Sequence, residues 1–393
     1  MNFVVTTCLL LATSSHIWGD QKIRYDNFVV HRLTPKTTEA VKALRALEEA
    51  PSGYDFWTAI RGVGYPVDVM VPPHLKYRFN DVINSGEFDA EVYISDVQKL
   101  IDNEKTNANI NAWLTSLAES DPERVSEYLS PLVTKIDLSS LKQIFMLENG
   151  KTDLVISSAV ATWVLNQLLT SEDPNVRQIA ESHDWYVFPV FNPDGFVYSH
   201  TTDRMWRKTR VPYFLCSGAD PNRNWGFHFN EGGSSSFPCS ETYCGPEAFS
   251  EPSTKTLSEF ISTIGSSLQA YIAFHSYSQL LLLPYGHTSQ HLENYQDLYD
   301  VGKKAATSLA QRYNTEFQVG NIVDILYVAS GGSMDWVKGT FGTPITYTYE
   351  LRDTGRYGFV LPPDQIIPSA EEILDSLVTI FQEFDNILPN RKN

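Results

Sequence analysis

Three short runs of almost uninterrupted apolar residues constrain the fold of this chain most. They cover residues 185–191, 271–274 and 280–283. A strand with water on one face alternates apolar and polar residues, so a continuous run predicts a strand that is covered on both faces. Such strands belong to sheets that carry helices on both sides. We therefore expect an α/β fold.

Helical spacing of apolar residues alternates with strand patterns along most of the chain. This alternation, without an internal repeat, predicts one large α/β domain over residues 106–393. Further strands are expected at 142–147 and 345–351. The expected helices cover residues 156–170, 251–264, 292–312 and 369–386.

The N-terminal part of the chain follows a different pattern. Residues 22–104 predict the order β-α-β-β-α-β of a small ferredoxin-like unit. Thr34 and Pro35 have the residue types of a helix N-cap and first helical position, so we expect the first helix to begin there. A connecting helix is expected over residues 95–104, and Lys105 follows it. A basic residue in an exposed connection is a cleavage site for a trypsin-like protease.

Composition excludes several classes of partner and anchor. The chain has 30 Lys and Arg residues against 47 Asp and Glu residues, a net charge of −17, which argues against nucleic acid as a main partner. No apolar run reaches the roughly 18 residues of a membrane-spanning helix. Residues 1–19 have the apolar stretch and small residues of a signal peptide, which predicts secretion. A signal peptide would remove Cys8, so one disulfide and one spare thiol are the simplest use of the other three cysteines.

Residue types suited to chemistry stand at the ends of predicted elements, where α/β folds place their ligands. Glu350 lies in an otherwise apolar strand, which is uncommon for an acid without a function. His275 directly ends the strand 271–274. Two polar segments with several cations precede them, residues 204–208 and residues 220–225.

In these segments the chain resembles the zinc metallocarboxypeptidases of the pancreatic carboxypeptidase A/B type, especially the insect digestive forms. Residues 22–104, including the stretch 53–57, resemble the propeptide of the same zymogens. The resemblance implies a signal peptide (1–19), an activation propeptide (20–105) and a carboxypeptidase domain (106–393). It also implies a mixed sheet flanked by helices, preceded by the ferredoxin-like α+β prodomain, and a disulfide between Cys216 and Cys239, with Cys244 left as a free thiol.

The resemblance assigns catalytic roles to three residues. Glu350 matches the general base and acid, and Arg207 matches the arginine that stabilises the oxyanion. His275 matches the distal ligand of the catalytic Zn²⁺, which the family holds with two histidines and one glutamate. A structural ion pair with Arg352 or Arg356 is the alternative reading of Glu350.

Four further residues match the substrate site of the family. Asn222 and Arg223 match the clamp for the terminal carboxylate of a peptide. Tyr327 matches the mobile tyrosine that closes over the bound peptide, and Met334 lies at the floor of the specificity pocket. Methionine is apolar, so an intact site would prefer aromatic or aliphatic C-terminal residues. The expected partners are peptide C-termini, the chain's own propeptide and an activating trypsin-like protease.

The first zinc pair of the family does not stand in this sequence. The family carries Gly-x-His-x-x-Glu-Trp just before the helix that begins at Ile156, and the matching ligand positions hold Lys151 and Leu154. Neither side chain replaces a zinc ligand. His228 and Glu231 have the His-x-x-Glu spacing. They follow the clamp segment, however, and are not expected to substitute for the missing zinc pair.

The departure extends over residues 124–155, which are about ten residues short of the family pattern. Both flanks match well, and an abrupt boundary favours an exchanged or missing exon, or a misread splice site, over gradual drift. The sequence thus predicts the zinc carboxypeptidase function for the family, with activity lost or impaired in this chain. The alternatives are a non-catalytic binder of peptide C-termini, a variant product of a gene for an active carboxypeptidase, and a non-functional product.

Overall fold

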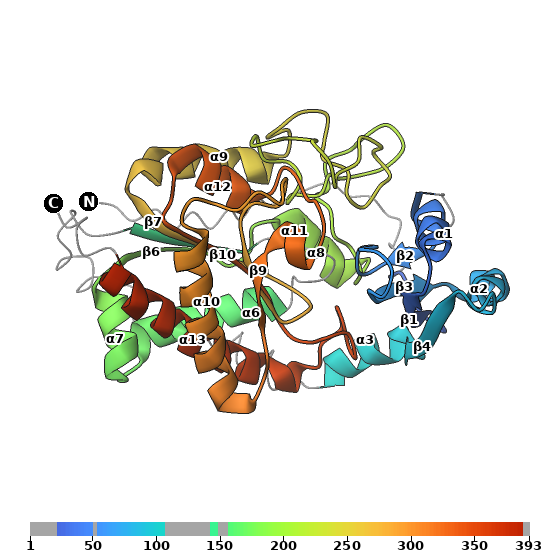
Figure 1. Cartoon of the computed structure of the whole chain (residues 1–393), viewed down its shortest axis with the longest axis horizontal. Helices are drawn as coiled ribbons and strands as arrows, with labels where there is room; N and C mark the ends of the chain where they lie inside the picture. The colour runs from blue at the N-terminus through green and yellow to red at the C-terminus, as the bar shows by residue number, and fades with distance from the viewer. Residues whose placement is uncertain (1–21, 50–52, 107–141, 148–155, 388–393) are drawn as a thin grey trace.

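The computed structural model describes residues 22–49, 53–106, 142–147 and 156–387. The chain forms a small N-terminal unit, the prodomain, and a large α/β domain that lies beside it (Figure 1). The expected signal peptide and most of the unusual stretch 124–155 lie outside the described residues.

The prodomain is an antiparallel four-stranded sheet in the order β2-β3-β1-β4, which confirms the expected ferredoxin-like unit. A closed apolar core joins one face of the sheet to its helices, with Leu33, Leu44, Val69 and Phe79 buried in it. The helix α3 leads away from the unit toward the large domain (Figure 1). The elements are β1 (Val29–Pro35), α1 (Thr38–Glu49), β2 (Asp55–Phe56), β3 (Val67–Val71), α2 (Lys76–Ile83), β4 (Phe88–Ile94) and α3 (Val97–Thr106).

The expected start of the first helix was wrong. Pro35 is the last residue of β1 and pairs with Phe88 of β4, so Thr34 lies inside a strand rather than at a helix cap. The hydroxyl of Thr37 accepts a hydrogen bond from the backbone N–H of Ala40 at 3.1 Å. Thr37 therefore caps the helix, and proline is tolerated at the end of the strand because the ladder ends there.

The large domain is built on a mixed six-stranded sheet in the order β6-β5-β7-β10-β8-β9. All neighbours are parallel except β8 and β10. The strands are β5 (Lys142–Leu147), β6 (Asp184–Phe188), β7 (Leu268–His275), β8 (Leu280–Leu283), β9 (Gln318–Asn321) and β10 (Ile345–Glu350). The helices are α6 (Ile156–Thr170), α7 (Pro174–Glu181), α8 (Pro193–Thr201), α9 (Pro252–Ile264), α10 (Tyr295–Tyr313), α11 (Ile322–Ile325), α12 (Ser333–Phe341) and α13 (Ile366–Ile387).

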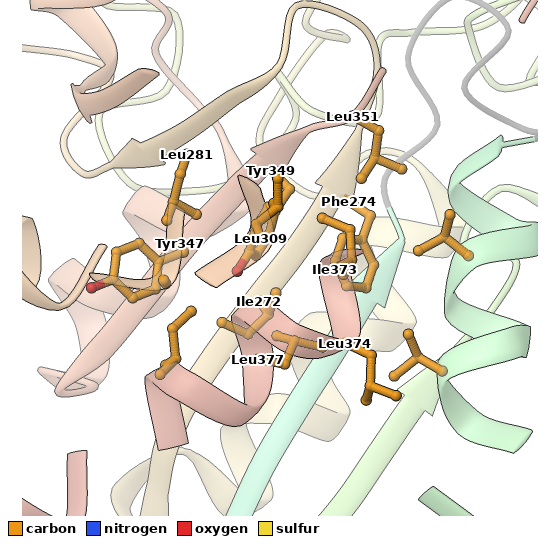
Figure 2. Packing of buried hydrophobic residues seen from close by; sticks show 14 of the residues in the cluster. Ile272, Phe274, Leu281, Leu309, Tyr347, Tyr349, Leu351, Ile373, Leu374 and Leu377 are labelled. Atoms are coloured by element: carbon orange, nitrogen blue, oxygen red, sulfur yellow. The ribbon is translucent and has the colours of Figure 1, made fainter. Parts of the chain in front are cut away.

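Helices cover both faces of this sheet, as the continuous apolar runs predicted. The helices α6, α7, α10 and α13 lie against one face, and α9 and α12 lie against the other (Figure 1). On the first face, Ile272 and Phe274 of β7 and Tyr347 of β10 pack against Ile373 and neighbouring leucines of α13 (Figure 2). The strand β6 is an exception, because it forms the edge of the sheet and its residues are only partly buried.

Two further expectations concern cysteines and membranes. The disulfide between Cys216 and Cys239 is formed and closes a loop of sequence separation 23, as the resemblance implied. Cys244 is buried and free, again as expected. Within the described ranges, no helix combines the length and the apolar character needed to cross a membrane.

Candidate active site

The site forms where the parallel strands β7 and β10 end side by side. His275 is the last residue of β7, Glu350 is the last residue of β10, and the two are paired in the strand register. The backbone N–H of Leu351 donates to the carbonyl of His275 at 2.8 Å and so continues the pairing beyond the strands. The fold therefore places the predicted zinc ligand and the predicted general base at one edge of the sheet.

Arg207 is fixed by a buried carboxylate. Its Nε and Nη2 both donate to Oδ2 of Asp220, at 2.9 and 2.7 Å. The Asp220 side chain is fully buried, and burial alone would raise the pKa of its carboxyl group. The charges of Arg207 and Arg223 outweigh burial, so the pKa of Asp220 lies below its ordinary value. Asp220 thus holds the predicted oxyanion arginine in one orientation as a permanent ion pair.

The same carboxylate organises the clamp segment. The backbone N–H of Asn222 donates to Oδ1 of Asp220 at 3.0 Å. The side chain of Asn222 lies between two parts of the site: its Oδ1 accepts from the N–H of Ser333 at 3.1 Å, and its Nδ2 lies 3.4 Å from Nε2 of His275. The clamp and the predicted zinc ligand are therefore in direct contact.

Arg223 is buried but keeps part of its guanidinium available. Its Nε donates to the carbonyl of Gly233 at 3.0 Å, and its Nη1 donates to the carbonyl of Asn222 at 2.8 Å. Within the part of the chain that the structure describes, Nη2 donates to no protein group. A Cβ atom at Gly331, where φ is 72°, would lie 2.4 Å from the carbonyl oxygen of Arg223. Only glycine fits there, so the turn Gly331-Gly332-Ser333 supports the clamp directly.

Tyr327 and Met334 stand on either side of that turn. Tyr327 lies in the loop between α11 and α12 and is partly exposed, which leaves it room to move. Met334 is buried in the first turn of α12, and the hydroxyl of Thr348 lies 3.4 Å from its sulfur. The neighbouring acid, Asp335, is engaged by the backbone N–H groups of Gly286 and His287. Its charge is therefore satisfied by these amides.

Arg352, one of the two partners considered for a structural ion pair with Glu350, is bound elsewhere. Its Nε and Nη2 donate to the two carboxylate oxygens of Glu372, at 2.8 and 2.6 Å. Glu372 belongs to α13, which packs against one face of the sheet. Arg352 therefore has a carboxylate partner other than Glu350.

The prodomain closes over this edge of the sheet. The hydroxyl of Tyr277, two residues after His275, donates to Oδ2 of Asp68 in β3 at 2.7 Å. Arg32 of β1 holds the same carboxylate with two hydrogen bonds of 2.6 Å. Burial, followed by the charge of Asp68, raises the pKa of Tyr277 far above its ordinary value. The tyrosine is therefore a permanent hydrogen-bond donor to the prodomain.

An apolar contact accompanies this polar one. The rings of Trp57 in the prodomain and Phe359 in the large domain meet edge to face with centroids 5.3 Å apart. The two residues share one buried cluster with Tyr277 and Met205. Sequence reasoning did not find these contacts. The acid Asp68 inside the strand VDVMV was the one available signal, because a buried charge requires a partner.

Of the three predicted zinc-ligand positions, only His275 lies among the described residues at this edge. Among the described residues, no three His, Cys, Asp or Glu side chains converge as metal ligands. The matching positions Lys151 and Leu154 lie outside the described residues, but an amine that is normally protonated and an alkyl group have no ligand chemistry for Zn²⁺. His228 hydrogen-bonds Glu231 on an exposed loop, where its ring stacks on His287.

Comparison with known proteins identifies the class to which this fold and site belong. Residues 142–376 match the zinc carboxypeptidase family, and residues 31–104 match the carboxypeptidase activation peptide. The chain belongs to the zinc carboxypeptidase family and carries its activation peptide.

Curated relatives agree with this assignment, and a solved structure shares the fold. The chain is 41% identical to zinc carboxypeptidase A 1 of Anopheles gambiae, over 95% of this chain and 93% of the relative. It is 52% identical to a zinc carboxypeptidase of Simulium vittatum, over 71% of this chain and 95% of that one. The crystal structure of carboxypeptidase A from Helicoverpa armigera shares the fold, with a TM-score of 0.78 at 23% identity, over 94% of this chain and all of that chain.

Proposed function

We propose that this chain is a secreted procarboxypeptidase whose large domain recognises peptide C-termini, while its hydrolytic activity is lost or impaired. One observation carries the proposal. Arg207, Asn222 and Arg223 form a hydrogen-bonded, partly buried arrangement beside His275. By the sequence match, the other two ligand positions of the family hold Lys151 and Leu154. In this proposal the substrate half of the site is retained, and the metal half lacks two of its three ligands.

Arg223 and Asn222 supply the recognition chemistry. A carboxylate binds most strongly to a guanidinium that is already oriented, because little side-chain entropy is then lost on binding. Two of the nitrogens of Arg223 are committed to backbone carbonyls, and this fixes the direction of Nη2. Binding a terminal carboxylate at Nη2 requires no metal ion.

The residue before the carboxylate is proposed to be aromatic or aliphatic. Met334 is 3% exposed and belongs to an apolar cluster with Val337. An aliphatic or aromatic side chain gains from contact with such a surface, whereas a Lys or Arg side chain would lose its hydration without gaining a counter-ion.

Hydrolysis requires more than the residues that remain. In the family, the bound Zn²⁺ activates water and polarises the scissile carbonyl. Glu350 can accept a proton at its carboxylate, and Arg207 can donate hydrogen bonds to a developing oxyanion. A single histidine does not hold Zn²⁺ tightly, since catalytic sites use three protein ligands. We therefore infer that the reaction is slow or absent.

A relative of this chain carries residues that this chain lacks. The alignment with zinc carboxypeptidase A 1 of Drosophila melanogaster runs over 424 positions, more than the 393 residues of this chain. That relative must therefore carry residues without a counterpart here. We propose that an exchanged exon or a misread splice site accounts for the short stretch 124–155 that the sequence indicates.

The prodomain makes the chain a zymogen in this proposal. Asp68 and Trp57 cover Tyr277 and Phe359 at the edge that carries the site, so a peptide reaches the clamp only after the prodomain leaves. Cleavage after Lys105 by a trypsin-like protease would release residues 20–105. The N-terminal signal peptide would direct the chain to the secretory pathway, where such proteases act.

Metal analysis and calorimetry on the trypsin-treated protein test the proposal. We expect clearly less than one zinc per chain, no hydrolysis of a dipeptide substrate ending in Phe, and measurable binding heat with a peptide ending in Phe. The same peptide with a C-terminal amide should not bind. Arg223→Ala should remove the heat, whereas Arg177→Ala, a matched change on α7 behind the sheet, should leave it unchanged.

The outcomes separate the candidate functions. Full zinc occupancy with hydrolysis would show an active carboxypeptidase. Glu350 would then act as the general base, and Arg207 would stabilise the oxyanion. Absence of binding heat in the wild type, or equal heat for Arg223→Ala, would refute recognition of peptide C-termini. Peptide mass spectrometry of the native protein across residues 124–155 would show whether this segment is made.

A further inference from the structure

Arg204 is a buried cation to which the carboxypeptidase chemistry assigns no role. It lies three residues before Arg207, is 5% exposed, and contacts the prodomain instead of the substrate site. Its Nε and Nη2 donate to the two carboxylate oxygens of Glu104, at 2.8 and 2.6 Å. Nη2 also lies 3.3 Å from the carbonyl of Phe359. The pair thus joins the end of the prodomain's last helix to the interior of the large domain.

Glu104 stands directly before the bond that activation must cut. The helix α3 extends to Thr106, so the backbone on both sides of the Lys105–Thr106 bond is helical. Earlier in the helix, Val97 and Ile101 are buried in a cluster with Met205 and Val360 of the large domain. The helix is therefore attached along one face, and among the described contacts the Glu104–Arg204 pair is the last one before the cleavage bond.

A serine protease of the trypsin class binds its substrate as an extended strand, and a helical bond must first unwind. When opening and closing are fast, the rate of cleavage follows the equilibrium population of the open form. Unwinding the last turn of α3 pulls Glu104 away from Arg204 and leaves a buried guanidinium without its carboxylate, which is costly. The ion pair therefore lowers the population that a protease can cut.

We propose that the Glu104–Arg204 ion pair sets the rate of zymogen activation by holding the cleavage bond in helical form. The inference rests on the zymogen proposed above and on cleavage after Lys105. It adds a second effect: Glu104 stays on the released propeptide, so the same pair retains the propeptide after the bond is cut. Activation then has two steps, cleavage and release, and both depend on one ion pair.

The test is limited trypsin digestion of the full-length zymogen, followed by gel electrophoresis and N-terminal sequencing of the product. The principal variant is Arg204→Lys, which keeps a positive charge but loses the two-pronged contact, and which leaves the sequence around the cleavage bond unaltered. We expect cleavage after Lys105 to be about tenfold faster than in the wild type, because the open form is more populated. Size-exclusion chromatography of the cut protein should show faster loss of the propeptide.

A second variant removes the other partner. Glu104→Gln should accelerate cleavage to a similar extent, but it changes the residue next to Lys105 and so can alter the protease's own preference. Peptides of residues 99–111 with Glu or Gln at position 104 measure that preference. The ratio of the cleavage rates of the variant and wild-type zymogens is then divided by the ratio of the rates for the two peptides. Glu39→Gln, on the exposed first turn of α1, is the matched control and should cleave like the wild type.

Each outcome is decisive. Equal cleavage rates for Arg204→Lys and the wild type, with both proteins folded by circular dichroism, would overturn the proposal. Faster cleavage of Glu104→Gln that the peptide ratio explains fully would also count against it. Lys105→Gln tests the cleavage site separately: if that variant is cut at an unchanged rate, the assumed activation site is wrong, whatever the ion pair does.

Discussion

Arg207 directs two nitrogens of its guanidinium at a single oxygen, Oδ2 of the fully buried Asp220. The other oxygen accepts the backbone N–H of Asn222. The Asp220 carboxylate therefore positions both the predicted oxyanion arginine and the predicted clamp by accepting their hydrogen bonds.

Removing this charge should destabilise the whole domain. Asp220→Asn keeps the shape of the side chain but removes the negative charge that holds Arg207 and leaves a neutral amide at a fully buried position. We expect a loss of about 3–5 kcal/mol in the free energy of unfolding, the range for breaking a buried ion pair on one side. Urea unfolding of the zymogen measures it. Glu231→Gln, an exposed change beside His228, should cost less than about 0.5 kcal/mol, and an equal cost for both would contradict the role given to Asp220.

The same residue predicts the direction of acid sensitivity. The pKa of Asp220 in the folded chain lies below the unfolded value of about 3.9. Its ionised form therefore contributes stability above that pH, and the contribution is lost as pH falls through the folded-state pKa. The stability gap between the wild type and Asp220→Asn should thus be widest near neutral pH and narrow below about pH 4. A gap that widens on acidification would contradict this assignment.

Local patterns predicted the fold better than they predicted its contacts. The run 271–274 identified β7 correctly because a strand between two helical layers has no polar face to show. Pro35 misled the prediction of α1, since a proline suits both the end of a strand and the start of a helix, and Thr37 supplied the true cap. Whether Pro35 ends a strand or begins a helix depends on its pairing with Phe88. These two residues are 53 positions apart, so no local pattern contains this contact.

In the candidate site, too, some contacts follow from local patterns and others do not. Glu350 and His275 could be predicted to meet, because parallel strands end at one edge of the sheet. The bond between Tyr277 and Asp68 joins residues 209 positions apart, and that between Arg204 and Glu104 spans 100 positions. Such contacts depend on how two domains dock, which composition and periodicity do not determine.

Glu350 should be dispensable for binding. Its carboxylate is expected to act on the scissile bond, whereas the clamp holds the terminal carboxylate. We expect Glu350→Gln to bind a Phe-ended peptide at least as tightly as the wild type, because one negative charge that repels the ligand is gone. Calorimetry after removal of the prodomain gives the two affinities. A tenfold weaker Kd for Glu350→Gln would show that Glu350 belongs to the binding site itself.

His275 should not control the metal content of this chain. If Zn²⁺ is not held, His275→Ala leaves the zinc per chain at the same low level as in the wild type, after dialysis against a weak chelator. In a complete site, loss of one of three ligands would lower occupancy sharply. Inductively coupled plasma mass spectrometry decides between the two cases, and a clear drop in zinc on His275→Ala would show that this chain builds a site despite Lys151 and Leu154.

The contact of Tyr277 with Asp68 should contribute to prodomain binding without contributing to the fold of either domain. Tyr277→Phe removes one hydrogen bond to a charged acceptor, which is worth about 1.5–3 kcal/mol, while Arg32 still neutralises Asp68. We expect the cleaved propeptide to bind the Tyr277→Phe enzyme domain about ten- to a hundredfold more weakly, with an unchanged melting temperature of the isolated enzyme domain. Titration of labelled propeptide measures the affinity. Tyr313→Phe removes the hydroxyl that bonds Glu371 at the end of α10 and serves as the control. An equal loss for the two variants would show that the Tyr277 hydroxyl has no specific role.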